Sequence, residues 1–218
     1  MNAVNYQKEL EKLIGKLESK PTLLLHSCCA PCSSYVLEYL CRHFQITVFY
    51  YNPNISEDAE YRKRVAEQKR LIAAYNKEEK GLPIAIIEGD YEPERFYEMA
   101  KGLEKCPEGG ERCFKCYEQR LRKTGELAKA QGFDYFCTTL TISPLKNAAK
   151  LNEIGLQLSE ELGVPWLPGD FKKKNGYKRS VELSAEYDLY RQNFCGCIYS
   201  KVEAEGRIAK EAGTCDIS

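Results

Sequence analysis

The chain has 218 residues, of which 43% are hydrophobic and 29% charged, and its formal net charge at pH 7 is zero. This composition is typical of a soluble globular protein, and any affinity for nucleic acid has to come from a local patch. No apolar run approaches the roughly 20 residues that cross a bilayer, and Met1–Lys20 lacks the apolar core of a signal peptide. We therefore expect a cytoplasmic protein.

The cysteine content is unusual for such a chain. Eleven cysteines accompany only two histidines, His26 and His43. In a cytosolic protein, clustered cysteines more often serve metal binding or redox chemistry than a framework of disulfides. Mixed His/Cys zinc sites and histidine-based acid–base catalysis are poorly supplied here, so thiolate chemistry is favoured.

The first third of the chain alternates between apolar strands and amphipathic helices. Apolar residues at helical spacing between Leu10 and Leu17 predict a first helix, and Pro31 stands where another helix would take its first residue. Ser56 is expected to cap a long polar helix. In chain order we predict a helix at Tyr6–Glu18, a strand at Pro21–Leu25, a helix at Pro31–Arg42, a strand at Ile46–Tyr51 and a helix at Glu57–Asn76.

The alternation continues to about residue 168 and then stops. We predict a strand at Pro83–Glu88, helices at Glu92–Ala100 and Glu111–Ala130, a strand at Phe133–Thr139, a helix at Asn147–Leu162 and a fifth strand at Val164–Leu167. The last fifty residues instead contain a basic loop at Phe171–Arg179, a helical pattern at Ser180–Gln192 and a final helix at Lys201–Ala212.

This order of elements predicts an α/β protein with a parallel, doubly wound sheet, because parallel strands need helical crossovers to connect them. We expect a single domain over residues 1–218, with a core at about 21–168. A helical C-terminal extension, at about 169–218, would carry the basic loop and the Cys-Gly-Cys sequence.

The turn after the first strand holds Cys28, Cys29 and Cys32. In an open α/β sheet this turn faces the crevice at the carboxyl ends of the strands, and the next helix N-terminus stabilises thiolates and anionic ligands. Neighbouring cysteines rarely bridge each other, so we expect Cys28 and Cys29 to face a shared metal. The alternative is that these side chains are small buried hydrophobic groups, and this alternative is strongest for Cys32.

A second pair, Cys113 and Cys116, lies at a predicted helix start, where Cys-x-x-Cys spacing aims two thiolates at one ion. With Cys28 and Cys29 it makes four thiolates, which suit either a structural zinc ion or a four-iron cluster. Arg112 and Lys115 beside the pair either offset the negative charge of such a site or are solvated helix charges.

The third pair is Cys195 and Cys197, with Gly196 between them. A disulfide across one residue closes a small, strained ring, and strained disulfides tend to be labile or catalytic. Gly196 supplies the backbone freedom that such a ring needs. A further pair of metal ligands is the competing interpretation.

The basic loop has five cations within Lys172–Arg179, flanked by the aromatic residues Phe171 and Tyr177. Such clusters bind phosphates, and exposed bases stack on such aromatic rings, although a solvated loop is the usual role of a charge run. Tyr50–Asn54, which end the second strand, either wall a substrate pocket or pack beside it.

Five motifs, taken in order, resemble one known family. They are Cys-Cys-Ala-Pro-Cys, Tyr-Tyr-Asn-Pro-Asn-Ile, Glu-Arg-Cys-x-x-Cys-Tyr-x-x-Arg-Leu, Thr-Thr-Leu-x-x-Ser-Pro-x-Lys and Cys-Gly-Cys-x-Tyr-Ser. Together they are similar to the cobalamin-independent epoxyqueuosine reductase family of bacterial tRNA modification. The resemblance covers about residues 23–200.

The resemblance implies an enzyme that removes the epoxide oxygen from epoxyqueuosine at the tRNA wobble position to give queuosine. It implies a nucleotide-binding (HUP-like) fold, a tRNA partner and an external electron donor. It assigns a [4Fe-4S] cluster to Cys28, Cys29, Cys113 and Cys116, and a redox-active disulfide to Cys195 and Cys197.

The same resemblance suggests a second metal, a mononuclear iron, which we assign to the vicinity of Cys32. It also places Ser143 and Lys146 beside the substrate pocket. The main alternative is a zinc-stabilised RNA-binding module without redox activity. A sulfur-transfer enzyme of the nucleotide-binding fold is less favoured, because the first turn is not a glycine-rich phosphate loop.

Overall fold

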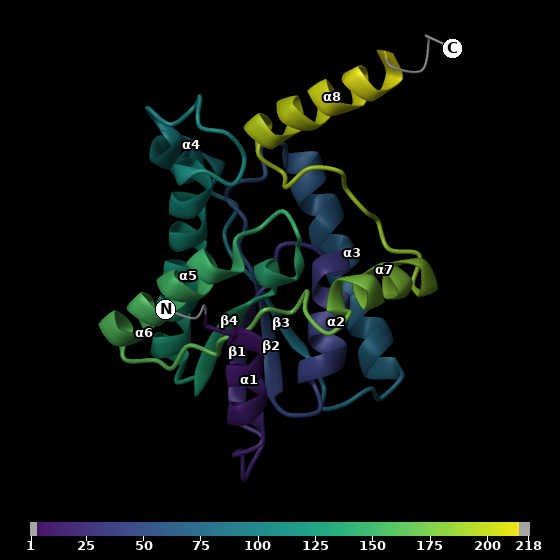
Figure 1. The fold of residues 1–218 in the computed structure, drawn as a ribbon. Helices are drawn as coiled ribbons and strands as arrows, with labels where there is room; N and C mark the ends of the chain where they lie inside the picture. The colour runs from purple at the N-terminus through teal and green to yellow at the C-terminus, as the bar shows by residue number, and fades with distance from the viewer. Residues whose placement is uncertain (1–3, 214–218) are drawn as a thin grey trace.

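A computed structural model describes the backbone of residues 4–213 and the side chains of residues 4–206. A parallel sheet of four strands in the order β3-β2-β1-β4 forms the centre (Figure 1). The strands are β1 (Thr22–His26), β2 (Gln45–Tyr50), β3 (Ala85–Glu88) and β4 (Tyr135–Thr138). The prediction of a parallel α/β fold is therefore confirmed.

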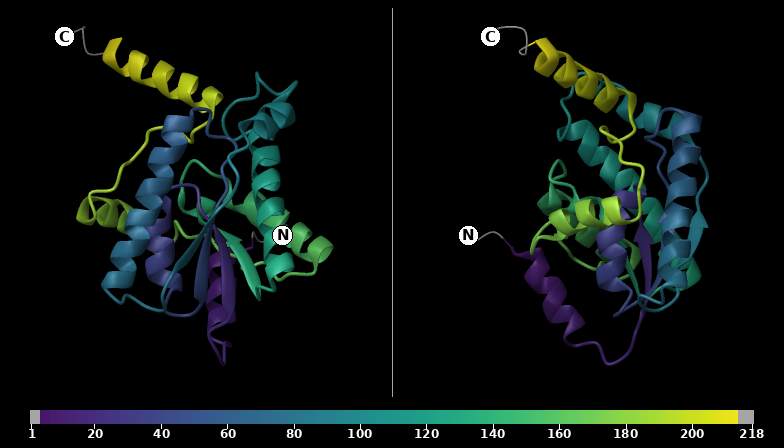
Figure 2. Two further views of the ribbon diagram at one scale, coloured as in Figure 1. Left: turned by 180° about the vertical axis from the view of Figure 1, so that it is seen from behind. Right: turned by 90° about the vertical axis from the view of Figure 1, so that its right-hand side faces the viewer.

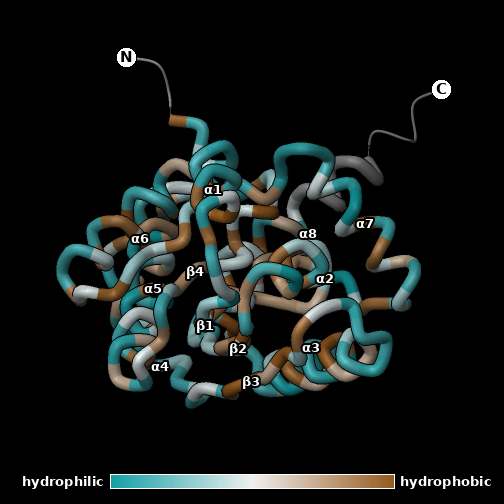
Figure 3. The backbone as a smooth tube through the Cα atoms, turned by 90° about the horizontal axis from the view of Figure 1, so that it is seen from below, coloured by the Kyte–Doolittle hydropathy of each residue, from teal (hydrophilic) through white to brown (hydrophobic). Residues whose placement is uncertain are grey.

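Helices cover both faces of the sheet and continue into the C-terminal part. They are α1 (Tyr6–Ile14), α2 (Ala30–Leu40), α3 (Asp58–Lys77), α4 (Pro93–Ala100), α5 (Glu111–Gln131), α6 (Ala148–Leu162), α7 (Gly176–Glu186) and α8 (Ile198–Gly213), with a 3-10 turn, η1 (Thr139–Ile142). Seen along the strands, α4, α5 and α6 lie on one side of the sheet and α2 and α3 on the other (Figure 3). Helix α8 stands out from the body (Figures 1 and 2).

The central strand β1 contributes to two apolar cores, because successive side chains of a strand point to opposite faces. Leu23 and Leu25 pack with the α2 and α3 side, whereas Leu24 packs with α5 and α6. All three leucines are fully buried. A strand covered on both faces reads as a continuous apolar run, which explains why it could be recognised in the sequence.

The strand order creates a reversal point beside β1. The chain runs from β1 to β2 and β3 on one side and then crosses to place β4 on the other. Open α/β sheets bind ligands at such a point, in the crevice at the carboxyl ends of the strands. Cys28 follows β1 and Thr139 follows β4, and the Cys28 N–H donates to Thr139 Oγ1 over 3.5 Å. The first cysteine turn therefore lies at the reversal point.

Some predicted elements differ from the structure. Residues 164–167 are not a fifth strand, since Trp166 makes only an isolated bridge to Phe136. Pro165 and Pro168 lack the N–H groups that would extend the pairing. Helix α1 ends at Ile14 rather than at Glu18, with Gly15 as its C-cap.

The predicted bounds of one helix and the predicted cap of another were wrong. Helix α7 begins at Gly176 and ends at Glu186, where residues 180–192 were predicted. A Cβ on Gly176 would clash with the Phe171 carbonyl and the Tyr35 ring, so only glycine permits this close approach to α2. Ser56 does not cap α3; its hydroxyl has no partner, and its N–H donates to the Gly196 carbonyl.

Candidate metal centre and substrate cavity

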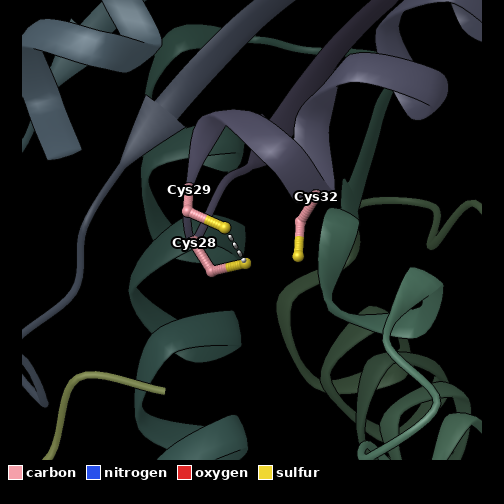
Figure 4. A group of neighbouring side chains, drawn as sticks. All are labelled: Cys28, Cys29 and Cys32. Carbon is pink, nitrogen blue, oxygen red and sulfur yellow. Dashed lines mark hydrogen bonds between the residues drawn. The ribbon is translucent and has the colours of Figure 1, made fainter. Parts of the chain in front are cut away.

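The first turn brings three thiols together at the N-terminus of α2 (Figure 4). The sulfurs of Cys28, Cys29 and Cys32 all lie within 4.8 Å of one another, and those of Cys28 and Cys29 are 3.7 Å apart. Two thiolates on one tetrahedral ion with metal–sulfur bonds near 2.3 Å would be about 3.8 Å apart. The trio is thus spaced to bind a metal ion, and Cys32 lies with the other two.

The three thiols of the first turn differ in their pKa values. Hydrogen bonds from Cys28 and Cys32 lower the pKa of the Cys29 thiol well below its ordinary value. Hydrogen bonds with Cys28 and then Cys29 raise the pKa of Cys32 well above its ordinary value. The thiols therefore favour one shared negative charge, and a bound cation is needed to deprotonate all three.

Cys113 and Cys116 lie in the first turns of α5, and both are buried. Cys113 accepts a hydrogen bond from the Gly109 N–H over 3.3 Å and packs in the same apolar cluster as Cys28. Within residues 4–206, no set of three ligand atoms that includes either cysteine lies within 4.8 Å. This spacing does not suit one zinc ion on Cys28, Cys29 and the α5 pair, whose thiols are farther apart than ligands of a single ion.

The charges beside this pair differ from the sequence-based expectation. Arg112 is turned away, and its guanidinium donates to the carbonyls of Leu103, Glu104 and Cys106. Lys115 is exposed and pairs with Glu111 on the same helix. Lys115 is therefore a solvated helix charge, whereas Arg112 borders a small void next to Cys113 and Cys116. A different arginine, Arg120, donates to Cys116 Sγ over 3.9 Å.

Cys195 and Cys197 have their sulfurs 3.6 Å apart, in the reduced form, with the Ser200 hydroxyl between them. The Cys195 carbonyl accepts from Arg64 Nη1 over 3.1 Å, and Gly196 has a φ of 117°. A Cβ on Gly196 would lie 2.8 Å from Ile55 and 3.2 Å from Arg64 Nη1. The glycine is therefore required by both conformation and space, as the sequence suggested.

One cavity of about 330 Å³ connects the first turn to this dithiol, and its size suits a small-molecule or nucleobase site. Its wall is formed by the three cysteines of the first turn, by η1 and the loop after it, and by residues 191–195. Ser143 and Lys146 line the cavity, as predicted. Tyr50 and Tyr51 do not; they are buried, and the Tyr50 hydroxyl donates to the Cys28 carbonyl over 3.4 Å.

A second, much smaller void of about 10 Å³ lies beside the cavity. It is bordered by both cysteines of α5 and by both cysteines of the dithiol. Three side chains, Arg120, Lys146 and Cys195, border both spaces. The thiols of the three sequence motifs are thus gathered around two adjoining spaces.

Lys146 is the buried cation next to the dithiol. Its ammonium lies 3.1 Å from Glu108, and both side chains are largely buried. A shared hydrogen bond with Cys197, supported by the charge of Lys146, lowers the pKa of Cys195 well below its ordinary value. Cys195 is therefore the more nucleophilic of the two thiols, and it is the one that lines the main cavity.

Arg120 belongs to a buried polar group behind the cysteines that sequence reasoning missed. Its Nε donates to His26 Nε2 over 3.3 Å, and its Nη2 donates to Asn52 Oδ1 over 2.6 Å. Burial first, and then the charge of Arg120, lower the pKa of His26 to about 3, so its imidazole is neutral. Because arginine can only donate, the His26 proton belongs on Nδ1, toward Thr138. Nε2 also lies 3.1 Å from the Tyr51 carbonyl, its partner in the other tautomer.

The basic loop is less available than its composition suggested. Four of its five cations have carboxylate partners, with Lys172 on Asp170, Lys174 on Glu11, Lys178 on Glu182 and Arg179 on Glu38. Phe171 is buried in the core. Tyr177 lines the cavity, and so do Arg191 and Asn193 from the segment after α7. Polar groups suited to a ligand therefore gather at the cavity, not along the loop.

No helix in the described part of the chain is long and apolar enough to span a membrane. A parallel α/β sheet with three groups of thiols around two adjoining spaces at its reversal point defines a thiol-rich α/β protein with a candidate metal-binding site. Comparison with known proteins then gives the family. The sequence model of the epoxyqueuosine reductase QueH family matches residues 23–203, and the chain belongs to this family.

Curated relatives agree over most of their length. The epoxyqueuosine reductase QueH of Staphylococcus epidermidis is 42% identical over 92% of this chain and 86% of its own. The protein of that name from Thermotoga maritima is 33% identical over 87% of this chain and 95% of its own. The resemblance seen in the sequence motifs is therefore confirmed.

Proposed function

We propose that this chain is an epoxyqueuosine reductase, which removes the epoxide oxygen from epoxyqueuosine in tRNA to give queuosine. The observation that carries the proposal is the cavity whose wall contains both the metal-binding trio of the first turn and the Cys195 thiol. The relatives named above support the substrate, since epoxyqueuosine reductase is their stated activity. This proposal replaces the zinc-stabilised RNA-binding module.

The reaction needs two electrons, and the dithiol matches that number. Removal of the oxygen breaks both C–O bonds of the epoxide, forms a C=C double bond, consumes two electrons and two protons, and releases water. Oxidation of Cys195 and Cys197 to a disulfide supplies two electrons and two protons. An external reductant, either a dithiol or a one-electron carrier, then restores the dithiol before the next turnover.

For the cofactor we propose a [4Fe-4S] cluster on Cys28, Cys29, Cys113 and Cys116, with a second metal beside Cys32. The donor set fits, because these thiols border two adjoining spaces and two buried cations lie among them to balance the negative charge of a thiolate cluster. When bound, these groups supply one-electron transfer and a Lewis acid for the departing oxygen.

The chain's own residues complete the site. The Lys146 ammonium, held by Glu108, carries a proton at Nζ on the cavity wall next to Cys195. The three cysteines lie on the cavity wall, so the modified base has to leave the anticodon stack to reach them. Tyr177 and Arg191 offer a stacking surface and a phosphate contact. We also infer that residues 1–218 act as one domain, because core and extension share this cavity.

The test is anaerobic reconstitution with iron and sulfide, followed by incubation with epoxyqueuosine-containing tRNA and a reductant. We expect about four or more irons per chain and conversion to queuosine, measured by mass spectrometry of the nucleosides. A Cys41→Ala variant is the matched control, because Cys41 is buried in the α2 core away from the cavity. A protein that binds only zinc and converts no epoxyqueuosine would refute the proposal.

A further inference from the structure

Three arginines are buried in the described part of the chain, and they differ in what balances their charge. Arg64 pairs with Glu60 over 2.7 Å, and Arg112 lies 3.8 Å from Glu203. Arg120, only 3% exposed, makes no ion pair with a carboxylate among residues 4–206. A buried charge without a counter-charge is strongly unfavourable, so the partner of Arg120 has to be sought among groups other than carboxylates.

Arg120 lies beside the thiols of the site. Its Nη1 donates to Cys116 Sγ over 3.9 Å. Arg120 also lines the cavity with Cys28 and Cys29, and it borders the smaller void with Cys113, Cys116 and Cys195. The side of Arg120 that lacks a carboxylate therefore faces the sulfur atoms of all three cysteine motifs.

The position of this guanidinium is fixed from behind. His26 at the end of β1 accepts from Nε, and Asn52 after β2 accepts from Nη2. Asn52 is itself held, since its Nδ2 donates to the Ser27 carbonyl over 2.8 Å. Because His26 and Asn52 are both neutral, they do not neutralise the charge of Arg120, and this charge acts on the neighbouring cysteine sulfurs.

We propose that Arg120 is the built-in counter-charge of the iron–sulfur site, holding the Cys116 thiolate in place and raising the reduction potential of the site. The inference rests on the proposed function, because it requires a cluster at these cysteines. Reduction adds negative charge to a cluster, so a fixed positive charge beside a ligand sulfur favours the reduced state. Arg120 acts through the ligands and is a positioning residue.

The test is a potentiometric titration of the reconstituted protein, followed by electron paramagnetic resonance. Arg120→Gln is expected to shift the reduction equilibrium at least tenfold toward the oxidised state, which is 59 mV for one electron. Arg120→Lys keeps the charge and should restore most of the potential. Arg122→Gln is the matched control: it removes an exposed arginine of the same helix, paired with Glu118 and Glu161, and should leave the potential unchanged.

Asn52→Asp provides a second route if Arg120→Gln does not fold. It keeps Arg120 but puts a carboxylate on Nη2, and it should lower the potential in the same direction. Iron content and the thermal unfolding midpoint, measured alongside, identify the folded, loaded variants. An unchanged potential in a loaded Arg120→Gln or Asn52→Asp protein would overturn the inference, whereas a wild-type protein that assembles no cluster would reject the proposed function.

Discussion

The two ends of the cavity hold their thiols in different ways. In the first turn, Cys28 and Cys29 lie between the central strand and α2. Backbone hydrogen bonds from the Ser27 N–H to the Phe49 carbonyl and from the Ser33 N–H to the Cys29 carbonyl fix the backbone on either side of them. At the other end, Cys195 follows an irregular segment and is held by side chains, with Arg64 and Asn54 donating to its carbonyl.

This difference suits the two kinds of chemistry. A metal site benefits from ligands whose positions the fold imposes, because binding then costs little rearrangement. The proposed redox dithiol would have to change shape, since its sulfurs are 3.6 Å apart and a disulfide bond is about 2.0 Å long. The Cys-Gly-Cys segment is held by these side-chain hydrogen bonds and by a backbone bond, from the Ser56 N–H to the Gly196 carbonyl, which permits that motion more easily than the sheet would.

Removing a thiol of the first turn should have the largest effect. We expect Cys28→Ser or Cys29→Ser to lower both the iron content and the activity. The activity should fall by at least about 100-fold, because removal of a residue that only hydrogen-bonds to a metal ligand already costs up to about 100-fold. Iron and sulfide per chain, together with nucleoside analysis, measure this. Full iron loading in either variant would show that the first turn is not the metal site.

Removing a thiol at the other end should separate the two functions. Cys195→Ser is expected to keep its iron, to convert less than one substrate per chain when the cluster is reduced beforehand, because one cluster stores one electron and the reaction needs two, and to lose repeated turnover in the presence of a thiol reductant. A rapid-quench time course distinguishes the two regimes. Wild-type turnover in a loaded Cys195→Ser protein would remove the dithiol from the reaction.

A smaller effect is expected from the backbone of the dithiol. Gly196→Ala forces a side chain onto a φ of 117° and against Ile55 and Arg64, so we expect a loss of stability of about 1–3 kcal/mol and a shifted disulfide equilibrium. Gly206→Ala in α8 is the control, because its Cβ meets nothing within 4 Å and alanine favours helices. Urea unfolding and titration against a glutathione buffer measure the two quantities. Equal behaviour of both variants would mean that the Cys-Gly-Cys turn is not constrained as described.

The smallest effect concerns the sheet that supports the first turn. Asp134 accepts hydrogen bonds from the Thr22 N–H and hydroxyl, and these lower its pKa below the ordinary 3.8. The stabilisation is therefore present above that value and is lost as the pH falls through the lowered pKa. Asp134→Asn should slightly lower stability at neutral pH and flatten its decline in acid, without changing the iron content. A wild-type acid profile in the thermal unfolding midpoint would contradict this.

The sequence was most informative about features that depend on residues close together in the chain. The apolar run of β1 followed by cysteines and Pro31 places a thiol turn at a strand end, and the parallel-sheet rule then places it in the crevice. The four strands and their helical crossovers were found for the same reason. The segment at 164–167 was misassigned because its apolar residues outweighed Pro165, whose missing N–H limits it to an isolated bridge.

What could not be predicted depends on distant partners. Glu11 and Glu38 neutralise cations of the basic loop, although they lie more than 140 residues away in the sequence. Gly176 starts α7 because it packs on Tyr35. Arg120 did carry a local signal, since it lies four residues after Cys116 and hence on the same helix face, but its burial without a carboxylate becomes visible only in the folded chain.

The wall of the cavity is completed late in synthesis. Cys28 and Cys116 leave the ribosome well before Cys195, which follows Cys116 by 195 − 116 = 79 residues. At about 5–20 residues per second this interval lasts about 4–16 s. During it the nascent chain has its proposed cluster ligands but lacks the segment that closes them in. For the proposed cluster, the order of the motifs along the chain therefore places two ligand groups outside the ribosome before the segment that encloses them.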